Sequence, residues 1–199
     1  MYHIEKKFIF VHPPKCAGTS VREILRKEIN STQGSVYEPK PHWPLQNWVD
    51  HIKHTHNLTS FDRKEWFIFG VVRNPFDRVV SYHEHIIRHN KRNPNSRFKE
   101  WVKTDLSNSF FTKEHNFMNM FKYNKEIVCD YFVRQENMEN DVKVLFERLN
   151  IQDYELLHIK HKTKRKDDDY RSFYDEETKK IVYDCFRDDI EYFGYEFGE

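Results

Sequence analysis

The sequence predicts an α/β fold, a P-loop-like three-layer domain in which helices flank a central, mostly parallel sheet. Continuous short apolar runs at residues 8–11, 66–72 and 127–133 are typical of strands that are buried on both faces. A helical pattern follows each run, and this alternation of strand and helix indicates a parallel sheet. The chain has 199 residues and no internal repeat, so we expect residues 1–199 to form a single domain.

Each expected helix has its own signal in the sequence. The first places four apolar side chains on one face: Val21, Ile24, Leu25 and Ile29. The second begins in "RNPFDRVVSYHEH", where Asn74 suits the N-cap and Pro75 the first helical position. Apolar residues repeat at helical spacing over residues 138–149 and again over 181–190, which predicts two further helices.

Composition excludes several classes of protein. Lys and Arg number 33 and Asp and Glu 32, so there is no basic excess of the kind that nucleic-acid-binding proteins show. The cysteines, at positions 16, 129 and 185, have neither zinc-site nor disulfide-framework spacing, which favours a reducing compartment. No signal peptide, Golgi-type anchor or long apolar span is present, so we expect a soluble, cytoplasmic protein without a membrane span.

The segment "FIFVHPPKCAGTS", residues 8–20, contains the first candidate anion site. A helix that begins near Gly18 would direct its first backbone N–H groups at the preceding turn, and Lys15 would add a positive charge there. Thr19 and Ser20 add hydroxyl donors. The alternative is an ordinary strand–turn–helix with an exposed lysine, because the segment does not have the GxxxxGK[ST] pattern of nucleotide-binding P-loops.

A second candidate anion site lies in "FGVVRNPFDRVVS". Arg73 directly follows an expected strand, and Ser81 lies about two helical turns further on. A guanidinium group is suited to binding phosphate oxygens, so the two side chains can converge on an anion. The alternative is a surface ion pair between Arg73 and Asp77, which would contribute little to stability.

Together, "HPPKCAGTS" and "RNPFDRVVS" resemble the paired 5′-phosphosulfate and 3′-phosphate motifs of the sulfotransferase family, whose donor is 3′-phosphoadenosine 5′-phosphosulfate (PAPS). The segments "YFVRQENMENDVKVLFERLNI" and "YRSFYDEETKKIVYDCFRDDIEYFGYEF" extend this resemblance. It covers most of the chain and is thinner over residues 33–48 and 89–124. Heparan 2-O- and chondroitin-type carbohydrate sulfotransferases and their bacterial relatives are the most similar in motif.

The resemblance implies a set of ligands for PAPS and for its product 3′,5′-ADP, without a metal. Lys15 would stabilise the leaving phosphate, and Arg73 and Ser81 would hold the 3′-phosphate. The loop that holds the phosphosulfate would comprise Lys15, Cys16, Ala17, Gly18, Thr19 and Ser20. A basic segment near residue 160 would fold over the nucleotide through Lys162, Thr163 and Arg165.

The histidine cluster "DHIKHTH" is the source of the expected general base. The related glycan sulfotransferases have a His-x-His or a single His ahead of the arginine strand, which makes His56 the first candidate and His54 the second. In an extended segment these two side chains would point to opposite sides. A zinc site at the cluster lacks a full set of ligands, so no metal is expected, and His12 is expected to pack or cap.

The predicted function is transfer of a sulfuryl group from PAPS to an acceptor hydroxyl, most simply that of a carbohydrate. Trp43, Trp48 and Trp101 could stack on sugar rings or belong to the core. Small alcohols, lipids and peptide tyrosines stay open as acceptors. Two alternatives remain: a P-loop nucleotide kinase, which would need magnesium and a GK[ST] ending, and a non-catalytic nucleotide- or glycan-binding relative, which would need no base.

Overall fold

The structure is a computed structural model that describes residues 1–30, 36–38, 40–89, 97–151 and 169–198. The chain divides into two compact units, and each is described by itself. Unit 1 comprises Met1–Val72 and Phe117–Lys160, and unit 2 comprises Arg73–Asn116 and His161–Glu199.

A five-stranded sheet forms the centre of unit 1, with the order β3-β1-β2-β4-β7. β2 (Phe8–Val11) runs parallel to β4 (Phe67–Val72), and β4 runs parallel to β7 (Tyr131–Arg134). The short strands β1 (Tyr2–His3) and β3 (Val36–Tyr37) are antiparallel additions beside β2. The three predicted apolar runs therefore supply the three parallel strands, and the carboxyl ends of β2 and β4 lie at one edge of the sheet.

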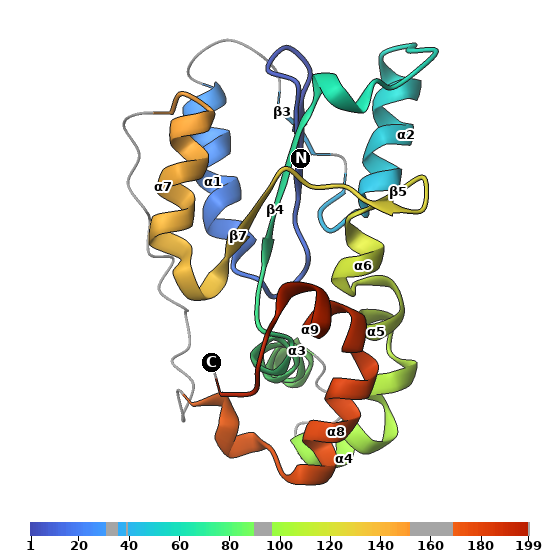
Figure 1. The fold of residues 1–199 in the computed structure, drawn as a ribbon, viewed down its shortest axis with the longest axis vertical. Coiled ribbons are helices and arrows are strands. Elements are labelled where there is room, and N and C mark those ends of the chain that lie inside the picture. The colour runs from blue at the N-terminus through green and yellow to red at the C-terminus, as the bar shows by residue number, and fades with distance from the viewer. Residues whose placement is uncertain (31–35, 39, 90–96, 152–168, 199) are drawn as a thin grey trace. The chain divides into compact units, whose positions relative to one another are not determined.

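Helices cover both faces of this sheet. Figure 1 shows α1 (Gly18–Asn30) and α7 (Met138–Arg148) on one side and α2 (Leu45–Thr55) on the other. α1 buries the predicted apolar face through Val21, Ile24 and Leu25. The predicted fold class, a mostly parallel sheet between layers of helices, is confirmed.

The third strand begins later than the sequence predicted. Ile127 belongs to β6 (Glu126–Ile127), which pairs with β5 (Lys122–Tyr123) after the short helix α6 (Phe117–Met120). Asp130 then makes two hydrogen bonds with Ile68. Its N–H donates to the Ile68 carbonyl at 2.6 Å, and its carboxylate accepts from the Ile68 N–H at 2.7 Å. Regular pairing of β7 with β4 starts only after this contact.

The histidine cluster was expected in an extended segment, and this was wrong, because residues 45–55 form the helix α2. Leu45, Trp48, Val49 and Ile52 are buried at helical spacing, and Pro44 precedes the first turn. His54 therefore lies in the last turn of α2 and His56 is its C-cap, so neither belongs to an extended segment. A 3₁₀ turn, Arg63–Glu65, leads from here to β4.

Unit 2 is a helical unit around its own apolar core. It contains α3 (Pro75–His89), α4 (Phe98–Thr104), α5 (Phe110–Glu114), α8 (Glu176–Cys185) and α9 (Arg187–Phe193), with 3₁₀ turns at Leu106–Asn108 and Tyr170–Phe173. The Asn74 side chain accepts from the Phe76 N–H at 3.0 Å, which confirms Asn74 as the cap of α3. The helix predicted over residues 181–190 is instead two helices, which meet at the buried residue Phe186.

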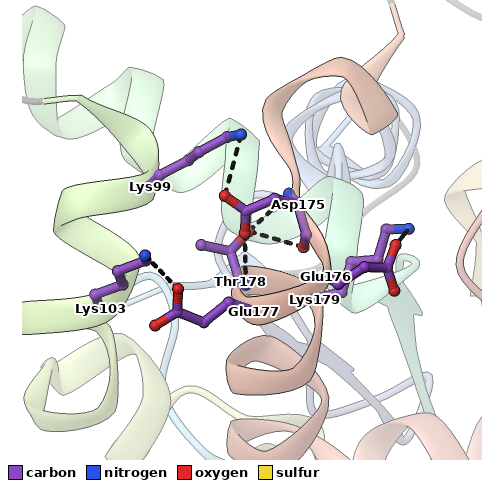
Figure 2. A network of polar contacts seen from close by, with 7 residues as sticks. All are labelled: Lys99, Lys103, Asp175, Glu176, Glu177, Thr178 and Lys179. Atoms are coloured by element: carbon purple, nitrogen blue, oxygen red, sulfur yellow. Dashed lines mark hydrogen bonds and ion pairs between the residues drawn. The ribbon is translucent and has the colours of Figure 1, made fainter.

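A polar network fixes the beginning of α8 (Figure 2). The Asp175 carboxylate accepts from the Thr178 N–H at 2.9 Å, and the Thr178 hydroxyl accepts from the Asp175 N–H, which completes a capping box. Two lysines of α4 add ion pairs, Lys99 with Asp175 at 3.1 Å and Lys103 with Glu177. Hydrogen bonds from Thr178 and the ammonium of Lys99 hold the pKa of Asp175 well below its ordinary value of 3.8.

We expect Asp175→Asn to remove a pH-dependent part of the stability. Because the pKa is lower in the folded protein than in the unfolded chain, ionised Asp175 stabilises the fold above about pH 4, and this stabilisation is lost as the pH falls toward the folded pKa. The melting temperature of the variant should lie below wild type at pH 6, and the difference should shrink toward pH 2. Asp188→Asn, in the exposed first turn of α9, is the control. A difference independent of pH would contradict the expectation.

Gly70→Ala is expected to destabilise unit 1. A Cβ on Gly70 would lie 2.4 Å from the ring of buried Phe121 and 2.6 Å from the Val11 carbonyl oxygen. Overpacking of this kind costs about 1–3 kcal/mol of the free energy of unfolding, which urea denaturation measures. Val144→Ala, on the exposed side of α7, should stay close to wild type. Equal free energies of unfolding for Gly70→Ala and wild type would contradict the expectation and would mean that Phe121 and Val11 can move apart to accommodate the methyl group.

Candidate functional site

The loop between β2 and α1 has a backbone conformation that suits an anion. Lys15 and Ala17 have positive φ angles of 68° and 60°, whereas Cys16 and Gly18 do not. Left-handed residues at alternate positions are a feature of nests, in which successive N–H groups face a common concavity that binds anions in phosphate loops. Left-handed conformations of residues other than glycine cost on the order of 1–3 kcal/mol each and cluster at functional sites.

Gly18 and His12 fix the shape of this loop. A Cβ on Gly18 would lie 2.2 Å from Cδ2 of the His12 ring, so only glycine fits at this position. The His12 ring is buried and stacks on Phe10 with a centroid distance of 5.7 Å. Burial, followed by the neighbouring charges of His42 and Arg22, lowers the pKa of His12 well below 6.5, so the ring stays neutral. The expectation that His12 packs is confirmed.

The predicted phosphosulfate residues have different surroundings in the loop. Lys15 and Ser20 are half-buried and Thr19 is exposed. The thiol of Cys16 is buried and lies 3.6 Å from the Pro14 carbonyl oxygen, which makes its side chain part of the support of the loop. α1 begins at Gly18, and the first N–H groups of a helix have no acceptor within the helix. The loop thus combines amides, a helix start and an ammonium group.

His42 binds directly to this loop. Its ring Nδ1 lies 2.7 Å from the carbonyl oxygen of His12, and the two rings lie 4.6 Å apart. A carbonyl oxygen only accepts, so Nδ1 carries the hydrogen. In the neutral imidazole, Nε2 is then the nitrogen that can take up a proton, which is the arrangement of a general base. His42 also has a positive φ angle of 63°, a third strained residue beside the loop.

His54 and His56 are not brought to the Lys15 loop. α2 starts just after His42 and extends about 16 Å to its last turn, so that its end lies near the amino end of β4 (Figure 1). There His56 Nε2 lies 3.1 Å from the Tyr2 hydroxyl, and its ring contacts Tyr2 and Tyr37 edge-on. This position gives His56 a packing and hydrogen-bonding role in the structure.

The second anion motif belongs to unit 2. Arg73 is buried, and its guanidinium donates to Asp77 Oδ2 through Nε at 2.7 Å and through Nη2. The pair that the sequence offered as a surface alternative therefore exists, with Arg73 buried and Asp77 partly buried. Ser81, also buried, follows Asp77 by four residues and thus lies on the same face of α3. Asp77 orients the guanidinium beside the face that carries Ser81.

Other predicted residues fall outside the described residues or inside the core. Lys162, Thr163 and Arg165 lie outside the described residues. Trp48 and Trp101 are 1% and 8% exposed, so they are core residues, whereas Trp43 is only half-buried. In the described part of the chain, no three His, Cys, Asp or Glu side chains are grouped to hold a metal ion. No helix there is long and apolar enough to cross a membrane.

His42 was not among the predicted site residues, because α2 was not predicted. The signal was present: Pro44 can start a helix, and residues 45, 48, 49 and 52 are apolar at helical spacing. A histidine just before a helix that begins at the same sheet edge as the anion loop would then have been preferred over the histidines at its far end.

Comparison with known proteins supplies the family. The family model described as "Sulfotransferase family" matches residues 2–196. The crystal structure of a sulfotransferase from Alicyclobacillus acidocaldarius is similar, with 12% sequence identity, a TM-score of 0.46 and 96% of each chain covered. No curated protein matches the chain in sequence. Because the family model spans nearly the whole length, the chain belongs to the sulfotransferase family.

Proposed function

We propose that this sulfotransferase transfers the sulfuryl group of PAPS to an acceptor hydroxyl, with the 12–20 loop as the phosphosulfate site and His42 as the base. The hydrogen bond from His42 Nδ1 to the His12 carbonyl carries the proposal, because it holds a proton-accepting nitrogen at the start of the anion loop. A loop that only binds an anion has no use for such a nitrogen.

In the proposed reaction, side chains of unit 1 accept the proton of the acceptor and stabilise the charge on the leaving phosphate. The acceptor oxygen forms a bond to sulfur while its proton passes to His42 Nε2. The bond between sulfur and the bridging phosphate oxygen breaks, and the electron pair stays on the phosphate of 3′,5′-ADP. In this proposal the Lys15 ammonium and the loop amides stabilise that negative charge. No metal is needed to balance these steps.

A P-loop nucleotide kinase is the weaker candidate. A kinase loop ends in GK[ST], where the lysine reaches the outer phosphates and the hydroxyl binds magnesium. Here the lysine precedes the turn at position 15, and Gly18-Thr19-Ser20 takes the place of that ending. A lysine ahead of Gly18, without a GK[ST] ending, suits the 5′-phosphosulfate of PAPS better than it suits a triphosphate.

Nucleotide selectivity tests the donor. We expect 3′,5′-ADP to bind clearly more tightly than 5′-ADP in calorimetric titrations, because Arg73 and Ser81 are the proposed 3′-phosphate ligands. Arg73→Ala should weaken 3′,5′-ADP about tenfold or more and leave 5′-ADP nearly unchanged, since charge-assisted hydrogen bonds contribute about 1.5–3 kcal/mol. Equal affinity of wild type for both nucleotides would refute the 3′-phosphate assignment.

The two candidate bases are separated by a matched pair of variants. His42→Ala should lower kcat by about 10²–10⁴ with 3′,5′-ADP binding retained. His56→Ala should keep kcat within a few-fold, because His56 contacts Tyr2 at the other end of α2. Transfer of label from PAPS is the measurement, on any acceptor found by screening extracts. The opposite result would restore His56, or His54, as the base, and full activity of both variants would place the base elsewhere.

Lys15→Ala tests the stabilisation of the leaving group. Removal of one charged donor from a developing anion typically lowers kcat by about 10²–10³. We expect a smaller loss for Lys15→Arg, which keeps the charge but not its position. Circular dichroism checks the fold of both variants. Unchanged turnover of Lys15→Ala would leave the loop as a binding site without a catalytic lysine.

The acceptor belongs to the same proposal. We take it to be the hydroxyl of a glycan, in line with the half-buried Trp43 next to His42. A cytoplasmic location is likewise proposed, from the cysteine spacing of the sequence.

A further inference from the structure

In unit 2 the chain turns back toward α3 after α9 ends. Gly194, the C-cap of α9, has a left-handed conformation with a φ angle of 65°. The segment 195–198 then passes beside α3 (Figure 1). It belongs to the same unit as Arg73 and Ser81, the proposed ligands of the 3′-phosphate, so its contacts bear on that site.

Phe197 anchors this segment among three aromatic rings. Its ring contacts the buried residues Phe76, Tyr170 and Tyr174 edge-on, at centroid distances of 5.1, 5.6 and 5.4 Å. The Lys179 ammonium lies 4.4 Å from the centroid of the Phe197 ring and adds a cation–π contact. Because Phe76 lies in the first turn of α3, these contacts tie the segment to the beginning of that helix.

Asn74 links the segment to the residue that follows Arg73. The Asn74 side chain is fully buried. Its oxygen accepts from the Phe76 N–H at 3.0 Å, and its nitrogen donates to the Glu196 carbonyl at 2.7 Å. The first hydrogen bond caps α3, and the second holds the cap against the segment. One side chain thus joins two parts of unit 2 that lie far apart in the sequence.

Tyr170 provides a second link. Its hydroxyl accepts from the Gly198 N–H at 2.7 Å. Burial and, to a smaller extent, the negative charge of Asp77 raise the pKa of Tyr170, so this hydroxyl is in the neighbourhood of the Asp77 carboxylate. That carboxylate holds the Arg73 guanidinium. The segment is therefore linked both to the neighbour of Arg73 in the chain and to the surroundings of its ion-pair partner.

We infer that Asn74, Tyr170 and Phe197 are positioning residues for the proposed 3′-phosphate site. The inference rests on the proposed function and adds residues that hold its ligands in place. A guanidinium presents its N–H groups in a rigid fork, so its contact with phosphate depends on its orientation. Arg73 precedes α3, and its orientation relative to Ser81 depends on how the beginning of this helix is held.

Calorimetric titration of conservative variants with 3′,5′-ADP and 5′-ADP tests the inference. Asn74→Ser keeps an N-cap oxygen but lacks the donor to the Glu196 carbonyl. Tyr170→Phe keeps the ring but lacks the acceptor for the Gly198 N–H. Each should weaken 3′,5′-ADP by about three- to tenfold, as the loss of a neutral hydrogen bond does, and leave 5′-ADP nearly unchanged. In combination with Arg73→Ala, the same changes should have little further effect, because the contact that they position is gone.

Controls separate positioning from stability. Tyr183→Phe removes another hydroxyl hydrogen bond of unit 2, to Glu191 at 2.9 Å, and should bind both nucleotides as wild type does. Phe197→Leu should retain more affinity for 3′,5′-ADP than Phe197→Ala, because leucine fills part of the space of the ring. Thermal unfolding gives the temperature range in which each variant is folded, and the titrations are made within that range.

Three results would overturn the inference: unchanged 3′,5′-ADP binding by both Asn74→Ser and Tyr170→Phe, equal weakening of the two nucleotides, or equal losses with and without the Arg73 side chain. Equal weakening would mean that these contacts only maintain the fold. The wild-type protein separates the two levels. If it prefers 3′,5′-ADP and the variants keep this preference, only the positioning role is refuted, whereas a wild type without the preference refutes the proposed 3′-phosphate site itself.

Discussion

The contact between Gly18 and the ring of His12 is the constraint on which the rest of the candidate site depends. The ring occupies the place of a Cβ, so the chain can pass over it only at a glycine. α1 begins at this glycine, directly after a loop in which Lys15 and Ala17 have positive φ angles. The same histidine offers its carbonyl to His42. One buried, neutral ring thereby supports both the candidate anion loop and the proposed base.

Packed neighbours support several residues with strained backbone conformations at this edge of the sheet. Lys15, Ala17 and His42 have left-handed conformations that the unfolded chain would avoid. They are maintained by well-packed neighbours, among them buried Phe10 below His12 and buried Cys16 against the Pro14 carbonyl. Such an arrangement fixes donors before the ligand arrives, which favours stabilisation of a developing charge over mere binding of the ground state.

Apolar patterning made much of the fold predictable. The runs at 8–11 and 66–72 are so uniformly apolar that both faces must be buried, and they became the central parallel strands. Asn74 and Pro75 marked the start of α3 correctly, because cap chemistry is local. Element boundaries were harder to predict where a contact between residues distant in the sequence sets them. The hydrogen bond between Asp130 and Ile68 makes β7 begin later than predicted. At Phe186, one predicted helix is divided into two.

The sequence by itself determined the strand–loop–helix order, the chemistry of the anion loop and the similarity in motif to sulfotransferases, because these depend on neighbours in the chain. Only the tertiary structure decided which histidine reaches the loop. "DHIKHTH" attracts attention as a cluster, yet the length of α2 carries it away from the loop, whereas His42 comes into contact with His12 across 30 positions. The reason is physical: spacing along a chain fixes local geometry, but proximity across a sheet edge depends on where each helix starts and how far it runs.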